Sequence, residues 1–141
     1  MINDGLKLKG KLAIALNGDV VQEVDNLVVT AGKGYVASRI KDASATAMSH
    51  MAIGSGSTAA AASDTALGSE LGRVSLTSTT VSSAGVTYVA TFAAGTGTGA
   101  VTEAALLNAS SGGTMLCRTV FSVVNKGSAD SMTITWTVTV S

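Results

Sequence analysis

The chain closes on SMTITWTVTVS (residues 131–141), in which apolar and hydroxyl side chains alternate. Every even position from Met132 to Val140 is apolar, and every odd position is Ser or Thr. A period of two is typical of a β-strand that turns one face toward a core. Most of these residues are β-branched, which suits a pleated and half-buried surface. The stretch therefore predicts a strand in the body of the fold, with Trp136 in the core.

The other face of this strand carries Thr where most soluble strands carry Lys or Glu. Hydroxyl groups provide no charge to keep neighbouring molecules apart. We therefore expect this face, or the sheet to which it belongs, to lie against another protein, with Thr135 and Thr137 as contact residues. The alternative is an ordinary Thr-rich surface of a monomer.

Similar patterns predict strands along the rest of the chain. Residues 11–16 and 19–24 flank Asn17-Gly18, a strong type I′ hairpin signal. The alternation begins earlier, at Leu6, and Gly10 within it indicates a bulge or bend. A second turn is expected at residues 82–85, between strands at 74–77 and 86–92. Further strands are expected at residues 49–54, 100–108, 114–121 and 131–141.

One helix is predicted at residues 31–41, with Thr30 as its N-cap. Val36, Ile40 and Ala43 fall on one face at helical spacing, so the helix should dock on a sheet through them. Residues 55–63 are a low-complexity loop, and residues 64–71 are a helical turn or an irregular connection. Eight or nine short strands with regular turn signals predict a single domain over residues 1–141, an all-β antiparallel sandwich or jelly roll with one short α-helix.

The composition limits the possible partners. Nine basic and nine acidic residues give zero net charge, which argues against nucleic acid because phosphate binding needs a positive excess. Only 13% of residues are charged, against about 25% in typical domains, so we expect other protein to cover much of the surface. The sequence shows neither a signal peptide nor an apolar run long enough for a membrane span. We expect synthesis in the cytoplasm and no membrane partner.

The residue types needed for catalysis are scarce. His50 is the only histidine and has no carboxylate near it in sequence, so it is interpreted as structural. Cys117 is the only cysteine, and one His with one Cys cannot build a usual zinc site. We therefore expect no enzyme activity, no metal and no cofactor. Four charges lie within apolar β segments, and we expect ion pairs among them, near a sheet edge or at a subunit contact: Glu70, Arg73, Glu103 and Arg118.

Several segments together resemble a module of tailed bacteriophages over roughly residues 27–141. They are MAIGSGST (51–58), SDTALGSEL (63–71) with Arg73, AVTEAALLNA (100–109), GTMLCRTVF (113–121) and TITWTV (133–138). A free-standing chain of this length is similar to the capsid cement, or decoration, proteins of podovirus-like heads. The resemblance implies a β-sandwich that forms small oligomers on the outside of the shell and has the major capsid protein as its partner.

The chain is expected to self-associate, as a dimer rather than a trimer. Residues 1–11 are either an extended arm, whose Lys7, Lys9 and Lys11 meet acidic patches on the shell, or an ordinary edge strand protected by charge. Two other functions remain open at this point: a tail, collar or fibre adaptor of the virion, and a carbohydrate-binding sandwich. The second is disfavoured because the few aromatic residues lie on apolar faces.

Overall fold

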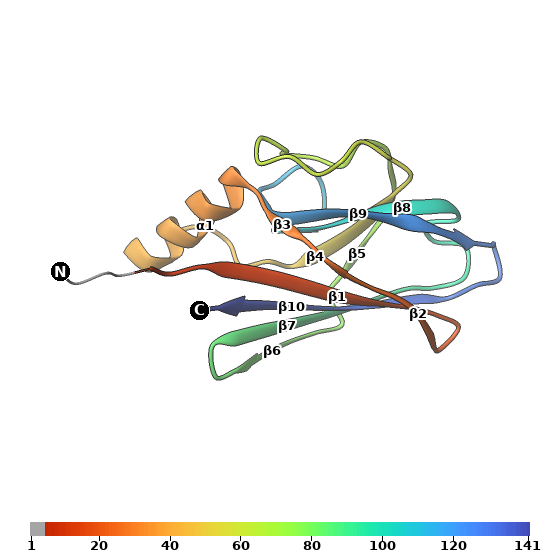
Figure 1. Ribbon diagram of the computed structural model, residues 1–141, viewed down its shortest axis with the longest axis horizontal. Coiled ribbons are helices and arrows are strands. Elements are labelled where there is room, and N and C mark those ends of the chain that lie inside the picture. Colours follow the sequence, from red (N-terminus) through yellow and green to blue (C-terminus); the bar gives the residue numbers. More distant parts are fainter. Residues whose placement is uncertain (1–4) are drawn as a thin grey trace.

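The computed structural model describes residues 5–141 as two five-stranded antiparallel sheets packed face to face, with one helix at an end (Figure 1). The helix α1 spans Thr30–Lys41. The first sheet has the strand order β2 (Asp19–Asp25), β1 (Leu8–Leu16), β10 (Met132–Val140), β7 (Gly85–Phe92) and β6 (Ser78–Ser82). The second has the order β3 (Leu27–Val28), β9 (Met115–Lys126), β8 (Gly99–Leu107), β4 (His50–Gly54) and β5 (Glu70–Ser75). The predicted all-β sandwich is confirmed.

The terminal strand β10 is the centre of the first sheet, between β1 and β7. Its even residues point into the sandwich, where Met132, Ile134 and Trp136 have no exposed surface. Each such side chain contributes roughly 1.5–3 kcal/mol of hydrophobic stabilisation. The alternation of residues 131–141 therefore predicted both the strand and the face that it buries.

The two sheets are joined at both of their sides by short crossings of the chain. On one side, the single residue Asn26 separates β2 in the first sheet from β3 in the second. Its side-chain Oδ1 accepts a hydrogen bond from Trp136 Nε1 at 2.7 Å. On the other side, Leu76 and Thr77 lead from β5 to β6. These crossings explain how consecutive strands come to lie in different sheets.

The predicted hairpins are present, with one change of partner. Asn17 and Gly18 have φ angles of 50° and 87°, as the type I′ turn requires. The turn at Ser82–Gly85 joins β7 to β6, not to the expected strand at residues 74–77. That prediction was wrong because every residue of β6 is exposed, and an exposed Ser/Thr strand has no apolar period to reveal it. The register irregularity of β1 falls between Ile14 and Ala15, not at Gly10.

The start of the chain belongs to the sheet from Leu8 onward. Leu8 lies opposite Val140 and Lys11 opposite Thr137, so residues 8–11 are part of β1 and do not form an extended arm. Lys7 continues this pairing, because its backbone N–H donates to Ser141 O at 2.7 Å and Ser141 N–H donates back at 2.8 Å. The apolar side chain of Leu8, which packs on the core, accounts for the longer strand. Residues 1–4 of the predicted arm lie outside the described part of the chain.

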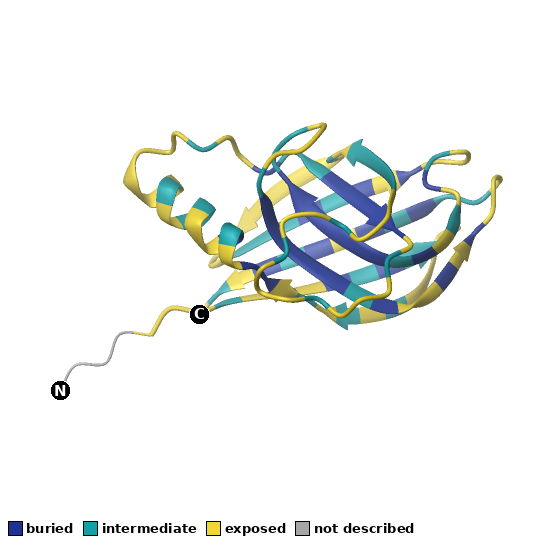
Figure 2. Cartoon of the chain, turned by 90° about the horizontal axis from the view of Figure 1, so that it is seen from above, coloured by how far each residue is buried: buried dark blue, intermediate teal, exposed yellow. Residues whose placement is uncertain are grey.

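The helix docks only in part as predicted. Val29 occupies the N-cap position, and Thr30 is helical and donates its backbone N–H to Ala62 O at 2.8 Å, so the predicted Thr30 cap was wrong. Val36 packs against the core as predicted, whereas Ile40 is 76% exposed and Ala43 lies beyond the end of the helix. The helix approaches the sheet most closely in its first turn. Gly32 is the residue buried there: a Cβ at this position would lie 2.1 Å from Leu116 O of β9. Figure 2 shows the rest of the helix in the exposed and intermediate colours, which alternate along its turns.

Candidate functional site

The outer face of the first sheet forms a broad hydroxyl-rich surface, which we call the threonine face. The register of the sheet places the odd residues of β10 beside alternate residues of β7 and β6 on this face. Its members are Thr133, Thr135, Thr137 and Thr139 of β10, Thr87, Val89 and Thr91 of β7, and Ser78, Thr80 and Ser82 of β6. These ten positions carry no charged side chain.

Hydroxyl contacts link neighbouring strands across the threonine face. Thr87 Oγ1 and Thr137 Oγ1 are 3.3 Å apart, and Thr91 Oγ1 and Thr133 Oγ1 are 3.0 Å apart. Cross-strand Thr pairs of this kind stabilise a sheet by roughly 0.2–1 kcal/mol each. Thr135 lies between Ala13 and Val89, whose side chains offer no polar partner. Its exposed hydroxyl is therefore available to a molecule that docks on this face.

The predicted lysines lie along the border of the threonine face. Lys11 is opposite Thr137 and Lys9 is opposite Thr139, while Lys7 is opposite Ser141. The structure thus brings all five predicted contact residues to one side of the first sheet: Lys7, Lys9, Lys11, Thr135 and Thr137. Lys11 Nζ also lies 3.7 Å from Glu23 Oε2, with both side chains more than 60% exposed. Such an exposed ion pair is weak, so it leaves Lys11 free to exchange partners.

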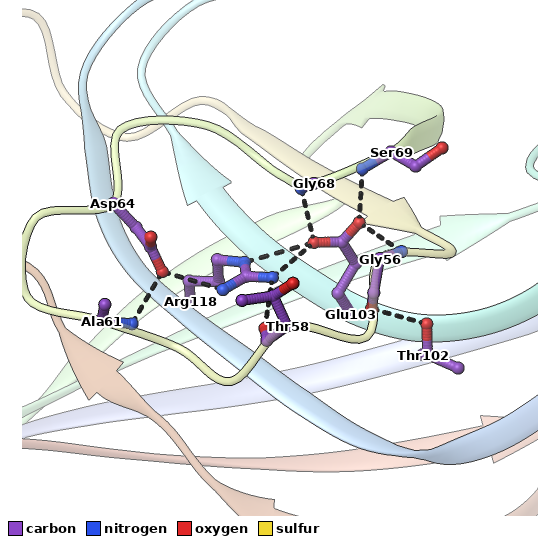
Figure 3. A network of polar contacts seen from close by, with 9 residues as sticks. All are labelled: Gly56, Thr58, Ala61, Asp64, Gly68, Ser69, Thr102, Glu103 and Arg118. Atoms are coloured by element: carbon purple, nitrogen blue, oxygen red, sulfur yellow. Dashed lines mark hydrogen bonds and ion pairs between the residues drawn. The ribbon is translucent and has the colours of Figure 1, made fainter.

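The second sheet has a buried ionic cluster on its outer face, under the loop of residues 55–69 (Figure 3). Glu103 of β8 is fully buried, and Arg118 of β9 is 2% exposed. Glu103 Oε1 accepts hydrogen bonds from Arg118 Nε at 3.2 Å and from Nη2 at 2.9 Å. Arg118 Nη1 donates to Asp64 Oδ2 at 2.8 Å, and Nη2 donates to Thr58 O at 3.0 Å.

The loop backbone completes this cluster. Gly56 N and Ser69 N donate to Glu103 Oε2 at 2.7 and 2.8 Å, and Gly68 N donates to Oε1 at 2.8 Å. Burial raises the pKa of Glu103, but the N–H donors of Ser69 and Gly68 and the Arg118 guanidinium outweigh it, so the pKa lies below its ordinary value. The hydrogen bond from Ala61 N–H, followed by Arg118, lowers the pKa of Asp64.

The cluster is therefore a clamp that holds the loop on the sheet. Its carboxylate accepts three backbone N–H groups and two guanidinium bonds, which leaves no accessible lone pair for acid–base chemistry. Of the predicted ion pairs, Arg73–Glu70 does lie on an edge strand, with Nη2 and Oε1 2.8 Å apart. Glu103–Arg118 does not, because β8 and β9 are inner strands of the second sheet. The involvement of Asp64 and the loop N–H groups had no signal in the sequence, because it depends on how residues 55–69 fold over the second sheet.

His50 and Cys117 carry the side chains best suited to catalysis, but their surroundings indicate structural roles. His50 Nδ1 lies 2.7 Å from Ser49 Oγ, and Nε2 lies 3.4 Å from Ser75 Oγ, so hydroxyls occupy the position of an orienting carboxylate. Burial raises the pKa of the Cys117 thiol well above its usual value, which keeps it protonated. Within residues 5–141, no three His, Cys, Asp or Glu side chains are grouped closely enough to hold a metal ion.

The chain matches no protein-family model, no curated protein and no solved structure. The described part of the chain contains no helix of the length and apolarity needed to cross a membrane.

Proposed function

We propose that this chain is a non-enzymatic structural protein of a tailed-bacteriophage virion, a cement protein that binds the outside of the capsid. The threonine face is the observation that carries this proposal. It gives the molecule a broad outer surface of ten uncharged positions on three adjacent strands. Hydroxyl groups cost less to dehydrate than charged groups, so such a face can be covered by protein at a small energetic penalty.

The contact is proposed to combine this neutral surface with a charged border. Thr135 and Thr137 would lie at its centre against the major capsid protein. Lys7, Lys9 and Lys11 would meet acidic side chains of the shell along one side of the same sheet. A charged rim of this type steers and orients association, while the neutral centre excludes water.

The segments that resemble phage proteins supply the residues of the clamp under the covering loop more than those of the proposed capsid contact. Gly56, Asp64, Gly68, Glu103 and Arg118 all lie within those segments, and all belong to the clamp. The resemblance therefore extends to the device that fixes the second sheet and its covering loop. A rigid scaffold of this kind suits a protein whose proposed task is to bridge neighbouring capsid subunits and resist the pressure of packaged DNA.

Imaging of purified phage heads, prepared with and without this protein, tests the proposal. Extra density on the outer shell at capsomer joints, with the threonine face toward the shell, is the expected result. Heads that look the same with and without the protein would refute it. Density at the tail or collar would refute the capsid assignment and favour a tail adaptor instead.

A further inference from the structure

The four edge strands of the two sheets differ in how they are protected from pairing with another strand. β2 carries Asp19, Glu23 and Asp25, and its pairing with β1 has a register irregularity. β3 has only two residues. β5 carries the Glu70–Arg73 ion pair, and Arg73 Nη1 also binds the carbonyls of Ala109 and Gly112 at 3.0 and 2.9 Å. Charge, shortness and irregular register are the usual devices that block edge-to-edge pairing.

β6 has none of these devices. Its sequence, Ser78-Thr-Thr-Val-Ser82, is uncharged and lies within the uncharged stretch of residues 74–102. All five residues are exposed, Val81 by 72%. Its register with β7 runs without a shift from Ser78↔Val89 to Ser82↔Gly85. β6 is therefore a regular and exposed edge that can accept another strand.

The hairpin defines which backbone groups face outward. A two-residue turn closes on the hydrogen-bonded pair Ser82 and Gly85, and such pairs alternate along an antiparallel ladder. Thr80 and Ser78 therefore direct their backbone groups to β7. The N–H and C=O groups of Thr79 and Val81 point to the open edge.

We propose that β6 pairs with β6 of a second copy, antiparallel, about a two-fold axis between the two Thr80 residues. This register places Thr79 of each copy opposite Val81 of the other, so that the outward groups form four inter-strand hydrogen bonds. Thr80 then faces Thr80, and Ser78 faces Ser82. The result is a continuous ten-stranded sheet.

The segment suits a second copy because it is symmetric under this operation. Thr and Val have nearly the same shape, so Ser-Thr-Thr-Val-Ser reads almost alike in both directions. A two-fold interface sets each surface patch against itself, and any charge near the axis would face a like charge. β6 carries none. A two-fold axis perpendicular to the sheet also leaves both threonine faces on the same side of the dimer.

Light scattering of the isolated full chain, over a range of concentrations, tests this inference independently of the proposed function. The expected species is a dimer. Thr80→Lys sets two ammonium groups across the axis and should raise the dissociation constant about tenfold or more, since like charges juxtaposed at an interface are strongly unfavourable. Val20→Lys, on the 62% exposed Val20 of β2, is the matched control and should leave the dimer unchanged. A monomer or a trimer, or equal effects of the two variants, overturns the proposal.

A double variant tests the register itself. Thr79→Lys combined with Val81→Glu places an ammonium group opposite a carboxylate at both ends of the proposed pairing, and should dimerise more strongly than Thr79→Lys alone. Thr80→Cys should form an intermolecular disulfide under mild oxidation, because non-hydrogen-bonded antiparallel pairs lie about 4.5 Å apart between Cα atoms. Cys117 is buried and does not compete. Failure of both results, with the variants folded by circular dichroism, contradicts the register.

Discussion

Glu103 and Arg118 bind each other from neighbouring inner strands, with Oε1 and Nη2 2.9 Å apart, beneath a loop to which neither residue belongs. Glu103 accepts a hydrogen bond from Gly56 N–H of that loop. Arg118 donates hydrogen bonds to Asp64 and Thr58 of the same loop. One buried ion pair thus fixes a segment that has few apolar residues to bury. The covering loop is ordered by hydrogen bonds more than by hydrophobic contact.

Removal of the Glu103 charge is expected to destabilise the fold strongly. Glu103→Gln retains the shape of the side chain but removes the fully buried counter-charge of Arg118 and leaves it with Asp64, whose side chain is 23% exposed. Breaking a buried pair in this way costs roughly 3–5 kcal/mol. Urea unfolding measures the loss. Glu70→Gln is the matched control, because the Glu70 side chain is 38% exposed and should contribute less than about 1 kcal/mol. Similar losses for the two variants would show that the clamp is not a principal source of stability.

The clamp also predicts loss of stability in acid. The pKa values of Glu103 and Asp64 are lower in the folded protein than their ordinary values of 4.5 and 3.8, so the unfolded chain binds more protons. Their contribution is complete above about pH 5 and declines as the pH falls through 4.5 and then through the lower folded pKa values. Unfolding free energies measured from pH 7 to pH 3 should decrease. The decrease should be smaller in Glu103→Gln, and an equally steep decrease in that variant would assign the acid sensitivity to other carboxylates.

The sequence predicted those parts of the fold in which a face is buried. Residues 131–141 and 11–16 alternate because one side of each strand packs in the core, and their strands were predicted correctly. β6 was missed because both of its faces are exposed, so selection for burial leaves no period in Ser78–Ser82. The docking of the helix was predicted in part: Val36 packs on the core, but the burial of Gly32 was missed because it depends on the absence of a side chain.

The residues of the candidate site also fall into a group that the sequence predicted and a group that it did not. Thr135 and Thr137 were identified from the alternation of a single strand, and the register then placed them beside Thr87 and Val89. The clamp could not be assembled from the sequence, because Gly56, Gly68 and Ser69 contribute backbone N–H groups whose direction depends on the folded loop. A side-chain pattern predicts which residues lie on one face of a strand. Backbone N–H donors in a loop cannot be predicted in this way, because any residue except proline has one.

The two glycines of α1 should respond to the same substitution in opposite directions. Gly32→Ala places a Cβ 2.1 Å from Leu116 O and forces the first turn of the helix away from β9, so it should destabilise the protein. Gly34→Ala meets no atom within 4 Å and should stabilise by about 0.5–1 kcal/mol, because Ala loses less backbone freedom in a helix. Thermal or urea unfolding of the two variants measures the difference. Stabilisation by both would mean that the helix does not approach β9 closely.

The threonine face gives the most direct test of the proposed contact with the capsid. Thr135→Lys with Thr137→Lys adds two charges to exposed or half-buried positions of β10 and should leave the free energy of unfolding within about 1 kcal/mol. Binding to purified heads, measured by co-sedimentation, should fall at least about tenfold, since two ammonium groups must be dehydrated in the contact. Val123→Lys is the control, because Val123 is 52% exposed on β9 of the other sheet. If both variants bind as the parent protein does, the threonine face is ordinary surface, and the contact must lie elsewhere on the molecule.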